Sequence, residues 1–128
     1  MGTTSSSQDL KGVRALVVED TWHVGMALQE LLEHLGAEVA GPAATVSEAE
    51  RLIAERPPTV AFVDVKLRNG ELAYGLIDAL HQRGIRVIVT SAFAVLPEKV
   101  EQIASLLPKP YTAAKVLATL RQPGSWSL

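Results

Sequence analysis

The sequence contains no cysteine and no excess of positive charge, and each of these absences excludes a class of protein or site. Without cysteine, disulfide bonds, thiolate catalysis and cysteine-bound zinc are excluded. The 12 lysine and arginine residues do not outnumber the 14 acidic ones, so the basic surface typical of nucleic-acid-binding proteins is missing. No apolar run approaches the length of a membrane span, and the polar N-terminal stretch does not have the form of a secretory signal. We therefore expect a cytoplasmic protein that neither inserts into a membrane nor binds nucleic acid directly.

Apolar stretches alternate with amphipathic ones along the 128 residues, of which 48% are hydrophobic. Nearly continuous apolar runs rich in β-branched residues are typical of strands buried on both faces. The predicted strands cover residues 13–18, 37–41, 59–65, 85–91 and 105–110. The predicted helices cover residues 21–36, 47–56, 72–84, 96–104 and 112–122. This alternation predicts a doubly wound α/β domain, in which helices cover both faces of a five-stranded parallel sheet.

Local signals mark where several of these elements begin. Ser47, with Glu50 three residues later, predicts a capping box at the start of the second helix. Thr112 is the predicted N-cap of the last helix. We expect a flexible N-terminal tail, one domain and a C-terminal tail, at residues 1–11, 12–121 and 122–128.

Ligands of parallel α/β sheets bind beyond the carboxyl ends of the strands, so the residues at those ends form the candidate site. In chain order these residues are Glu19, Asp20, Asp64, Thr90, Ser91 and Lys109. Three acids brought together repel one another unless a cation joins them. Their hard oxygen ligands, without a converging pair of histidines, favour Mg²⁺ or Mn²⁺ over zinc. Asp20 taken alone could be only a helix N-cap, a role that is compatible with metal binding.

This set of side chains suits phosphoryl transfer to a carboxylate, which depends on positioning and on neutralising the phosphoryl charge. Asp64 is the candidate nucleophile because it ends the central strand. Glu19 and Asp20 would hold the metal ion, directly or through water. Lys109 would pair with Asp64 and then with a phosphoryl oxygen, and Ser91 would donate a hydrogen bond to another phosphoryl oxygen.

Four short blocks, VVED, FVDVKL, VIVTSA and LPKPY, carry a family resemblance. In this order and spacing, over roughly residues 12–121, the sequence resembles the receiver domains of response regulators, the CheY-like fold. The resemblance implies a sheet in the order 2-1-3-4-5 and a cis peptide bond between Lys109 and Pro110. It implies that Asp64 accepts a phosphoryl group from a histidine kinase or a histidine phosphotransfer protein and that the domain signals by a conformational change. It also implies a set of Mg²⁺ ligands: Glu19, Asp20, Asp64 and the main-chain carbonyl of Lys66.

The same resemblance makes Ser91 the switch hydroxyl and Lys109 the invariant lysine of the family. We choose Ser91 over Thr90 because the family pattern places a small residue after the hydroxyl, and Ala92 follows Ser91. Strand alternation would turn the Thr90 side chain the other way.

The sequence departs from the family pattern at Leu106, where an aromatic switch residue is common. Phe93 and Tyr111 are the candidates to replace it. The fourth helix, predicted at 96–104, is also short or irregular, which suggests an unusual output surface. These features resemble a subgroup of stand-alone receivers that carry a TGY-type motif in place of TSAF.

Three functions remain in competition. The first is a phospho-accepting receiver that signals by binding an unidentified downstream protein. The second is an adaptor that keeps the fold and signals without phosphorylation, which Leu106 and the short fourth helix suggest. The third is an aspartyl-phosphate phosphatase of the haloacid-dehalogenase type; Lys66 occupies the place of its second aspartate, so no enzyme activity is expected. Whether the chain forms a homodimer, and whether it is complete or a fragment, stay open.

Overall fold

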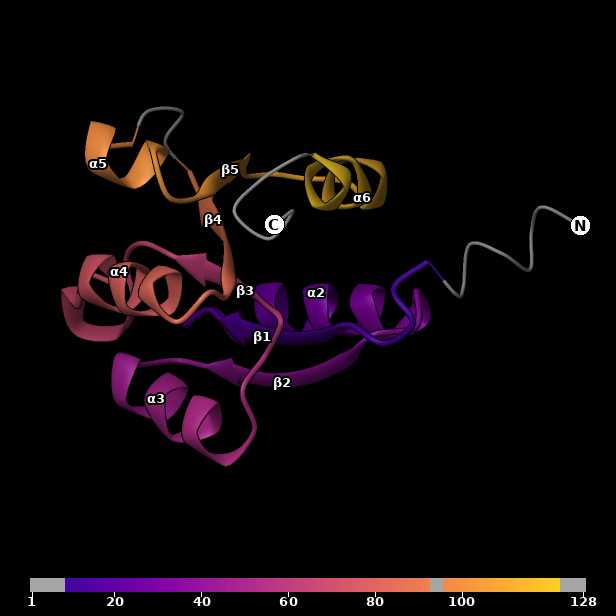
Figure 1. The fold of residues 1–128 in the computed structure, drawn as a ribbon, viewed down its shortest axis with the longest axis horizontal. Coiled ribbons are helices and arrows are strands. Elements are labelled where there is room, and N and C mark those ends of the chain that lie inside the picture. Colours follow the sequence, from indigo (N-terminus) through magenta and orange to yellow (C-terminus); the bar gives the residue numbers. More distant parts are fainter. Residues whose placement is uncertain (1–8, 93–95, 123–128) are drawn as a thin grey trace, which may run out of the picture.

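A five-stranded parallel sheet forms the centre of the molecule (Figure 1). The computed structural model describes residues 9–92 and 96–122. The strands are β1 (Arg14–Val18), β2 (Glu38–Ala43), β3 (Val60–Asp64), β4 (Arg86–Ser91) and β5 (Ser105–Pro108). They lie in the order β2-β1-β3-β4-β5, and every neighbouring pair is parallel. The α/β fold and the strand order that the resemblance implies are therefore confirmed.

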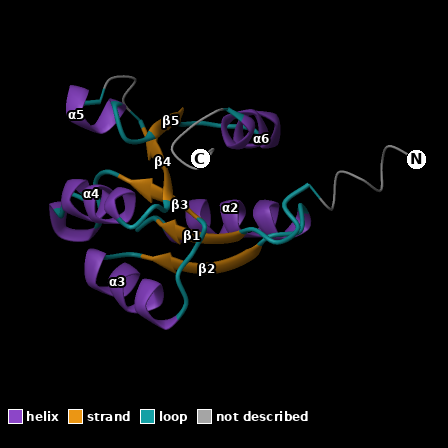
Figure 2. Cartoon of the chain, in the orientation of Figure 1, coloured by secondary structure: helices purple, strands orange, loops and turns teal. Residues whose placement is uncertain are grey.

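Helices cover both faces of this sheet (Figure 2). They are α2 (Trp22–His34), α3 (Val46–Glu55), α4 (Tyr74–Gln82), α5 (Glu98–Glu101) and α6 (Ala113–Arg121), with a 3₁₀ turn η1 (Arg68–Gly70). The helices α3, α4 and α5 pack against one face, and α2 and α6 pack against the other. Among the residues that the structure describes, no helix is long and apolar enough to cross a membrane.

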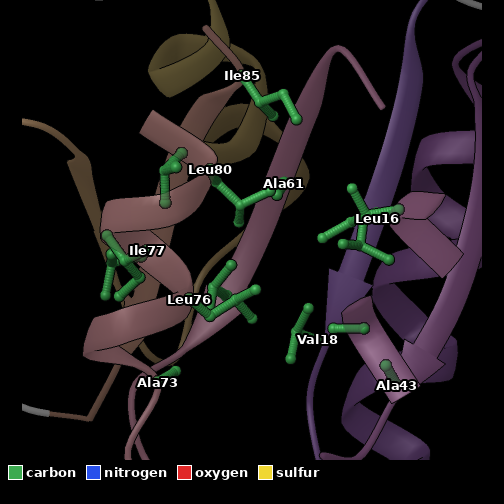
Figure 3. Close-up of a cluster of buried hydrophobic side chains, with 14 of the residues drawn as sticks. Leu16, Val18, Ala43, Ala61, Ala73, Leu76, Ile77, Leu80 and Ile85 are labelled. Atoms are coloured by element: carbon green, nitrogen blue, oxygen red, sulfur yellow. The ribbon is translucent and has the colours of Figure 1, made fainter. Parts of the chain in front are cut away.

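Alternate residues of the strands contribute their side chains to two separate hydrophobic cores, one on each face of the sheet. In β1, Leu16 and Val18 belong to the core beneath α3 and α4, whereas Ala15 and Val17 belong to the core beneath α2 and α6. Figure 3 shows the first core, in which Leu76 and neighbouring side chains of α4 lie beside β3. Because both faces of the central strands are covered, these strands are apolar at nearly every position.

The capping box of α3 differs from the prediction. Thr45, not Ser47, is the N-cap: its hydroxyl accepts a hydrogen bond from the Glu48 N–H at 3.2 Å. The Glu48 carboxylate accepts a hydrogen bond from the Ala44 N–H at 3.0 Å. The segment TVSEAE holds two overlapping patterns with a hydroxyl three residues before a glutamate. Because β2 ends at Ala43, the helix begins at the first pattern, and the prediction at the second was wrong.

The N-terminal boundary of the domain also lies earlier than predicted. Leu10 is buried in the core beneath α2 and α6, and its N–H donates to the Leu35 carbonyl at 2.8 Å. Asp9 forms an ion pair with Arg121 of α6 at 3.2 Å. The predicted tail therefore extends too far, because one leucine in a polar stretch has no periodicity that reveals its burial. The rest of the two predicted tails, residues 1–8 and 123–128, lies outside the described residues.

The helix between β4 and β5 is shorter than predicted. Only the single turn α5 forms within the predicted range 96–104, and residues 102–104 then lead into β5, which begins at Ser105. Leu106 of β5 is partly buried and packs against the core beneath α3, α4 and α5. Phe93, one candidate for the aromatic switch role, lies outside the described residues. Thr112 is confirmed as the N-cap of α6, with its hydroxyl accepting from the Lys115 N–H at 3.2 Å.

Gly41 forms a bulge in the edge strand β2. The pairing register with β1 shifts between Leu16 and Val18, and Gly41 has a φ of +97°. A Cβ atom at this position would collide with the carbonyl oxygen of Val17. We expect Gly41→Ala to lower the free energy of unfolding by about 3 kcal/mol, through the strained φ and the collision together.

Urea denaturation measures this loss, and Gly70→Ala is its matched control. Gly70 has a φ of +77°, but nothing lies within 4 Å of the Cβ that alanine would add. A loss of only about 1 kcal/mol is expected there, from the strained φ alone. Equal losses in the two variants would show that the Val17 carbonyl does not restrict position 41.

Candidate functional site

Three carboxylates meet at the carboxyl edge of the sheet. The strands β1 and β3 are neighbours and pair Val18 with Val63, so the next residues, Glu19 and Asp64, leave the sheet side by side. Asp20 follows one residue later. Glu19, Asp20 and Asp64 each place a carboxylate oxygen within 4.8 Å of the other two. The structure therefore brings together the three acids that the sequence places at strand ends.

Lys109 joins two of these acids. Its Nζ donates to Glu19 Oε1 at 2.7 Å and to Asp64 Oδ2 at 3.0 Å. The backbone of Lys109 is held in place beside β4, because the Lys109 N–H donates to the Ser91 carbonyl at 2.7 Å. This hydrogen bond extends the pairing of β4 with β5 by one residue. The peptide bond between Lys109 and Pro110 is cis, as the resemblance implies.

Glu19 is the most enclosed of the three acids, with 4% of its side chain exposed. Its second oxygen, Oε2, accepts a hydrogen bond from the Thr21 N–H at 3.2 Å. Both carboxylate oxygens are thus engaged by groups of the protein. Burial raises the pKa of the Glu19 carboxyl, and the negative charge of Asp64 adds to the rise, against the opposing hydrogen bonds from Lys109 and Thr21.

The site carries an excess of negative charge. Burial alone lowers the pKa of the Lys109 ammonium, but the hydrogen bonds and charges of Glu19 and Asp64 outweigh burial and leave that pKa raised. Lys109 is therefore charged at neutral pH. The formal charges of three carboxylates and one ammonium sum to two negative charges, which is the charge that one divalent cation neutralises.

A hollow of about 360 Å³ opens beside these groups. Its polar lining residues are Asp20, Asp64, Lys66, Ser91 and Lys109. Of the two hydroxyl residues that end β4, Ser91 lines the hollow and Thr90 does not. The choice of Ser91 therefore agrees with the placement of its side chain, while its role as a switch stays a prediction.

The backbone at Lys66 provides a further oxygen beside the hollow. Main-chain hydrogen bonds on either side of it run from Ala73 N–H to the Val65 carbonyl at 2.8 Å and from Leu67 N–H to the Glu71 carbonyl at 2.7 Å. Within the described residues, no backbone N–H donates to the Lys66 carbonyl itself. Carboxylates and a carbonyl are the hard oxygen ligands that Mg²⁺ prefers, so this donor set fits that ion.

Comparison with known proteins places this geometry in a family. The chain is 31% identical over 111 residues to the phyllosphere-induced regulator PhyR of Methylorubrum extorquens, and it spans 42% of that protein's length with 84% of its own. No protein-family model matches the sequence. The solution structure of SdrG from Sphingomonas melonis Fr1 has a TM-score of 0.75 and 27% identity, over 84% of this chain and 92% of that one. The PhyR receiver (REC) domain from Erythrobacter litoralis has a TM-score of 0.75 and 26% identity, over 88% of this chain and 95% of that one. The chain is a response-regulator receiver domain.

Exposed apolar and aromatic side chains occur in the wall of the acidic hollow and near it in the sequence. Trp22, Leu72 and Tyr74 are exposed by 69%, 53% and 36%, and Leu72 and Tyr74 line the hollow. Trp22 begins α2, two residues after Asp20. Leu72 is not among the site residues predicted from the strand ends. The signal that could have found it is its position in the loop that follows a strand-end aspartate.

A second hollow, of about 530 Å³, shares Lys109 and Ala92 with the first. The helix α2 contributes His23 and Val24 to its wall, and the segment after β5 contributes Pro110 and Tyr111. Tyr111 is partly buried, and burial raises the pKa of its hydroxyl. The structure thus places one candidate for the missing aromatic switch beside Lys109; its role in switching stays a prediction.

Proposed function

We propose that this receiver domain accepts a phosphoryl group on Asp64 and signals by the conformational change that follows. The donor would be a phosphorylated histidine of a histidine kinase or a histidine phosphotransfer protein. One observation carries the proposal: Lys109 Nζ contacts both Glu19 and Asp64 at the wall of an accessible hollow. Asp64 keeps 14% of its side chain exposed, so a donor can reach its carboxylate.

The arrangement suits a direct displacement at phosphorus. A carboxylate oxygen of Asp64 would form the new bond to phosphorus while the bond from phosphorus to the donor nitrogen breaks, and the electron pair would stay on that nitrogen. The Lys109 ammonium donates to Glu19 Oε1 at 2.7 Å and would keep this hydrogen bond while it also binds a phosphoryl oxygen. Ser91 would donate its hydroxyl to another phosphoryl oxygen. These groups would supply positioning and charge neutralisation, on which phosphoryl transfer mainly depends.

Mg²⁺ fits this proposal because of the excess charge and the oxygen donors. Asp20, Asp64 and the Lys66 carbonyl would hold the ion directly. Glu19 would act on it mainly through charge, since both of its oxygens are already engaged. When bound, the ion would neutralise part of the charge of the phosphoryl oxygens.

Addition of Mg²⁺ is expected to raise the melting temperature of the protein. Binding to the folded state alone stabilises it, by about 2.7 kcal/mol when the free ion is at a hundred times its Kd. Differential scanning calorimetry with MgCl₂ checks this, against NaCl at the same ionic strength and against Asp20→Asn, for which a smaller shift is expected. A wild-type melting temperature that does not respond to MgCl₂ would remove the metal from the proposal.

The direct test of the proposed function is the intact mass of the protein after incubation with acetyl phosphate and Mg²⁺. The wild type is expected to gain one phosphoryl group, and Asp64→Asn is expected to gain none. A wild type that stays unmodified with both acetyl phosphate and a phosphorylated histidine phosphotransfer protein would overturn the proposal. No turnover of a phosphomonoester is expected in parallel assays.

The surface around the site supports a protein as the donor. Leu72 exposes apolar area in the wall of the acidic hollow, and Trp22 is exposed at the start of α2. The second hollow is lined by Val24, Pro110 and Tyr111. Exposed apolar surface next to a reactive group is typical of a protein docking site. A small-molecule donor would need none of it.

A second candidate function is an adaptor that signals without phosphorylation. The single-turn α5 and the aliphatic Leu106 favour it, because both lie where the family pattern predicts a longer helix and an aromatic residue. If Asp64→Asn bound the natural partner as tightly as the wild type, with and without a phosphoryl donor, the adaptor function would replace the proposed one.

A further inference from the structure

Arg86 is a buried charged residue at the first position of β4, with 1% of its surface exposed. Its guanidinium donates to the carbonyl oxygens of Thr119 at 2.8 Å, Leu120 at 3.2 Å and Gln122 at 3.1 Å. It also donates to the hydroxyl of Ser105 at 3.0 Å. One side chain therefore joins β4, β5 and the end of α6.

These contacts reinforce the end of α6, where the Gln122 N–H also donates to the Thr119 carbonyl at 3.2 Å. The last carbonyl groups of a helix have no partner within it, and a positive charge near them is favourable. Arg86 supplies both the donors and the charge to the end of α6, from a position 33 residues before Thr119. Burial lowers the pKa of the Arg86 guanidinium, yet an arginine stays charged in proteins.

The segment from Ser105 to Arg121, which contains β5 and α6, is thus held by polar contacts at two places. At one end of β5, Lys109 binds Glu19 and Asp64. At the other end, Arg86 binds Ser105 and the last carbonyl groups of α6. The charges around Lys109 would change on phosphorylation of Asp64. The four Arg86 hydrogen bonds described above go to carbonyl groups and a hydroxyl, whose charge phosphorylation would not change.

We propose that Arg86 is the fixed anchor of the β5–α6 segment, and that phosphorylation of Asp64 moves this segment at its Lys109 end while the Arg86 end stays in place. Arg86 is a positioning residue in this scheme, since it touches none of the reacting groups. The motion rests on the proposed function, whereas the anchor rests on the contacts of Arg86 alone.

Residue-resolved amide exchange by NMR, on the full chain without any phosphoryl donor, tests the anchor. In Arg86→Met, the amides at the end of α6 are expected to exchange at least about tenfold faster relative to those of β1 and β3. Lys115→Met, which removes an exposed cation of the same helix far from its C-terminal end, is the control and is expected to leave this ratio unchanged. Equal acceleration in α6, β1 and β3 would show that Arg86 only fills the core, and would overturn the anchor.

Two milder variants keep the test decisive if Arg86→Met does not fold. Arg86→Lys retains the charge but has fewer donors, and Ser105→Ala removes one acceptor. Both are expected to accelerate exchange in β5 and α6 alone, by less than Arg86→Met would. No acceleration in either variant would overturn the anchor.

Beryllium trifluoride with Mg²⁺, a stable phosphoryl analogue, tests the motion. In the wild type, amide chemical shifts are expected to change around Lys109 and much less at Thr119 to Gln122. In Arg86→Lys the change is expected to spread to the end of α6. Equal changes at both ends of the wild-type segment would overturn the motion. A wild type that does not respond at all would count against the proposed function and the motion together, while the exchange experiment still decides the anchor.

Discussion

Asp64→Asn is expected to abolish phosphoryl uptake while leaving the fold intact. Asparagine has nearly the same shape, but its neutral amide offers no anionic oxygen to attack phosphorus. The substitution also removes one of three crowded negative charges, so the variant is expected to be at least as stable as the wild type. Intact mass spectrometry after incubation with acetyl phosphate and Mg²⁺ measures uptake, and thermal unfolding measures stability.

Asp78→Asn is the matched control for this experiment. Asp78 is exposed on α4, where its carboxylate accepts a hydrogen bond from Gln82 at 3.0 Å. It is an aspartate of the same domain without a place in the hollow, so normal uptake is expected. Uptake that persists in Asp64→Asn and disappears in another aspartate variant would assign the acceptor to that other residue.

Lys109→Met is expected to lower the free energy of unfolding by about 2–3 kcal/mol at neutral pH, because it leaves the buried Glu19 charge without its partner. This loss is at or below the smallest losses of stability found when one partner of a fully buried ion pair is removed, since 23% of the Lys109 side chain is exposed. Lys66→Met is the control: its side chain is exposed in the wall of the same hollow, and little change is expected. Urea denaturation of the two variants and the wild type measures the difference.

The double variant Glu19→Gln/Lys109→Met separates the ion pair from the packing of the lysine chain. Removing the charge of Glu19 is expected to recover part of the loss, since no unpaired buried carboxylate then remains. If the double variant were as unstable as the sum of the single variants Glu19→Gln and Lys109→Met, the two side chains would not interact. A Lys109→Met protein as stable as the wild type would contradict the pair altogether.

The loss in Lys109→Met is also expected to depend on pH. The folded-state pKa of Glu19 is raised, so the folded protein binds this proton more tightly than the unfolded chain, whose glutamate pKa is about 4.3. Without Lys109 that pKa rises further. Protonation of Glu19 then stabilises the variant as the pH falls through the raised value, and the deficit relative to the wild type shrinks.

The deficit is expected to shrink at high pH for a different reason. The pKa of Lys109 is raised in the folded wild type, so its contribution is complete below the ordinary lysine value of about 10.4. That contribution is lost as the pH rises through the raised folded value. Urea denaturation of both proteins across this range measures the effect, and a deficit independent of pH would exclude an ionic cause.

Much of this domain could be predicted because the signals are local. The apolar runs of β1, β3 and β4 report burial on both faces, which is why the strands could be located to within a few residues. The acids that follow β1 and β3 could be placed together because parallel strands end at one edge of a sheet. The N-cap of α6 at Thr112 was equally local, since its partner Lys115 lies three residues away.

Other features could not be predicted because their partners lie far away in the sequence. Leu10 is buried only because the chain passes over the end of α2, where its N–H meets the Leu35 carbonyl. Thr45 and Ser47 offer the same capping pattern, and only the end of β2 selects between them. In the sequence, Arg86 is a charged residue at the start of an apolar strand, and nothing nearby predicts its burial. Its partner Thr119 belongs to α6, 33 residues later.

The fold class, the edge of the sheet that bears the site and the types of residue at that edge could all be derived from the amino-acid sequence alone. These follow from periodicity and from strand ends, which are properties of neighbouring residues. Which carboxylates the lysine pairs with depends instead on the three-dimensional packing of the strands. Lys109 meets Glu19 across 90 residues of sequence and Asp64 across 45. No local preference determines which carboxylate a lysine contacts at such separations; the packing of β1, β3 and β5 into one sheet brings these groups within hydrogen-bonding distance.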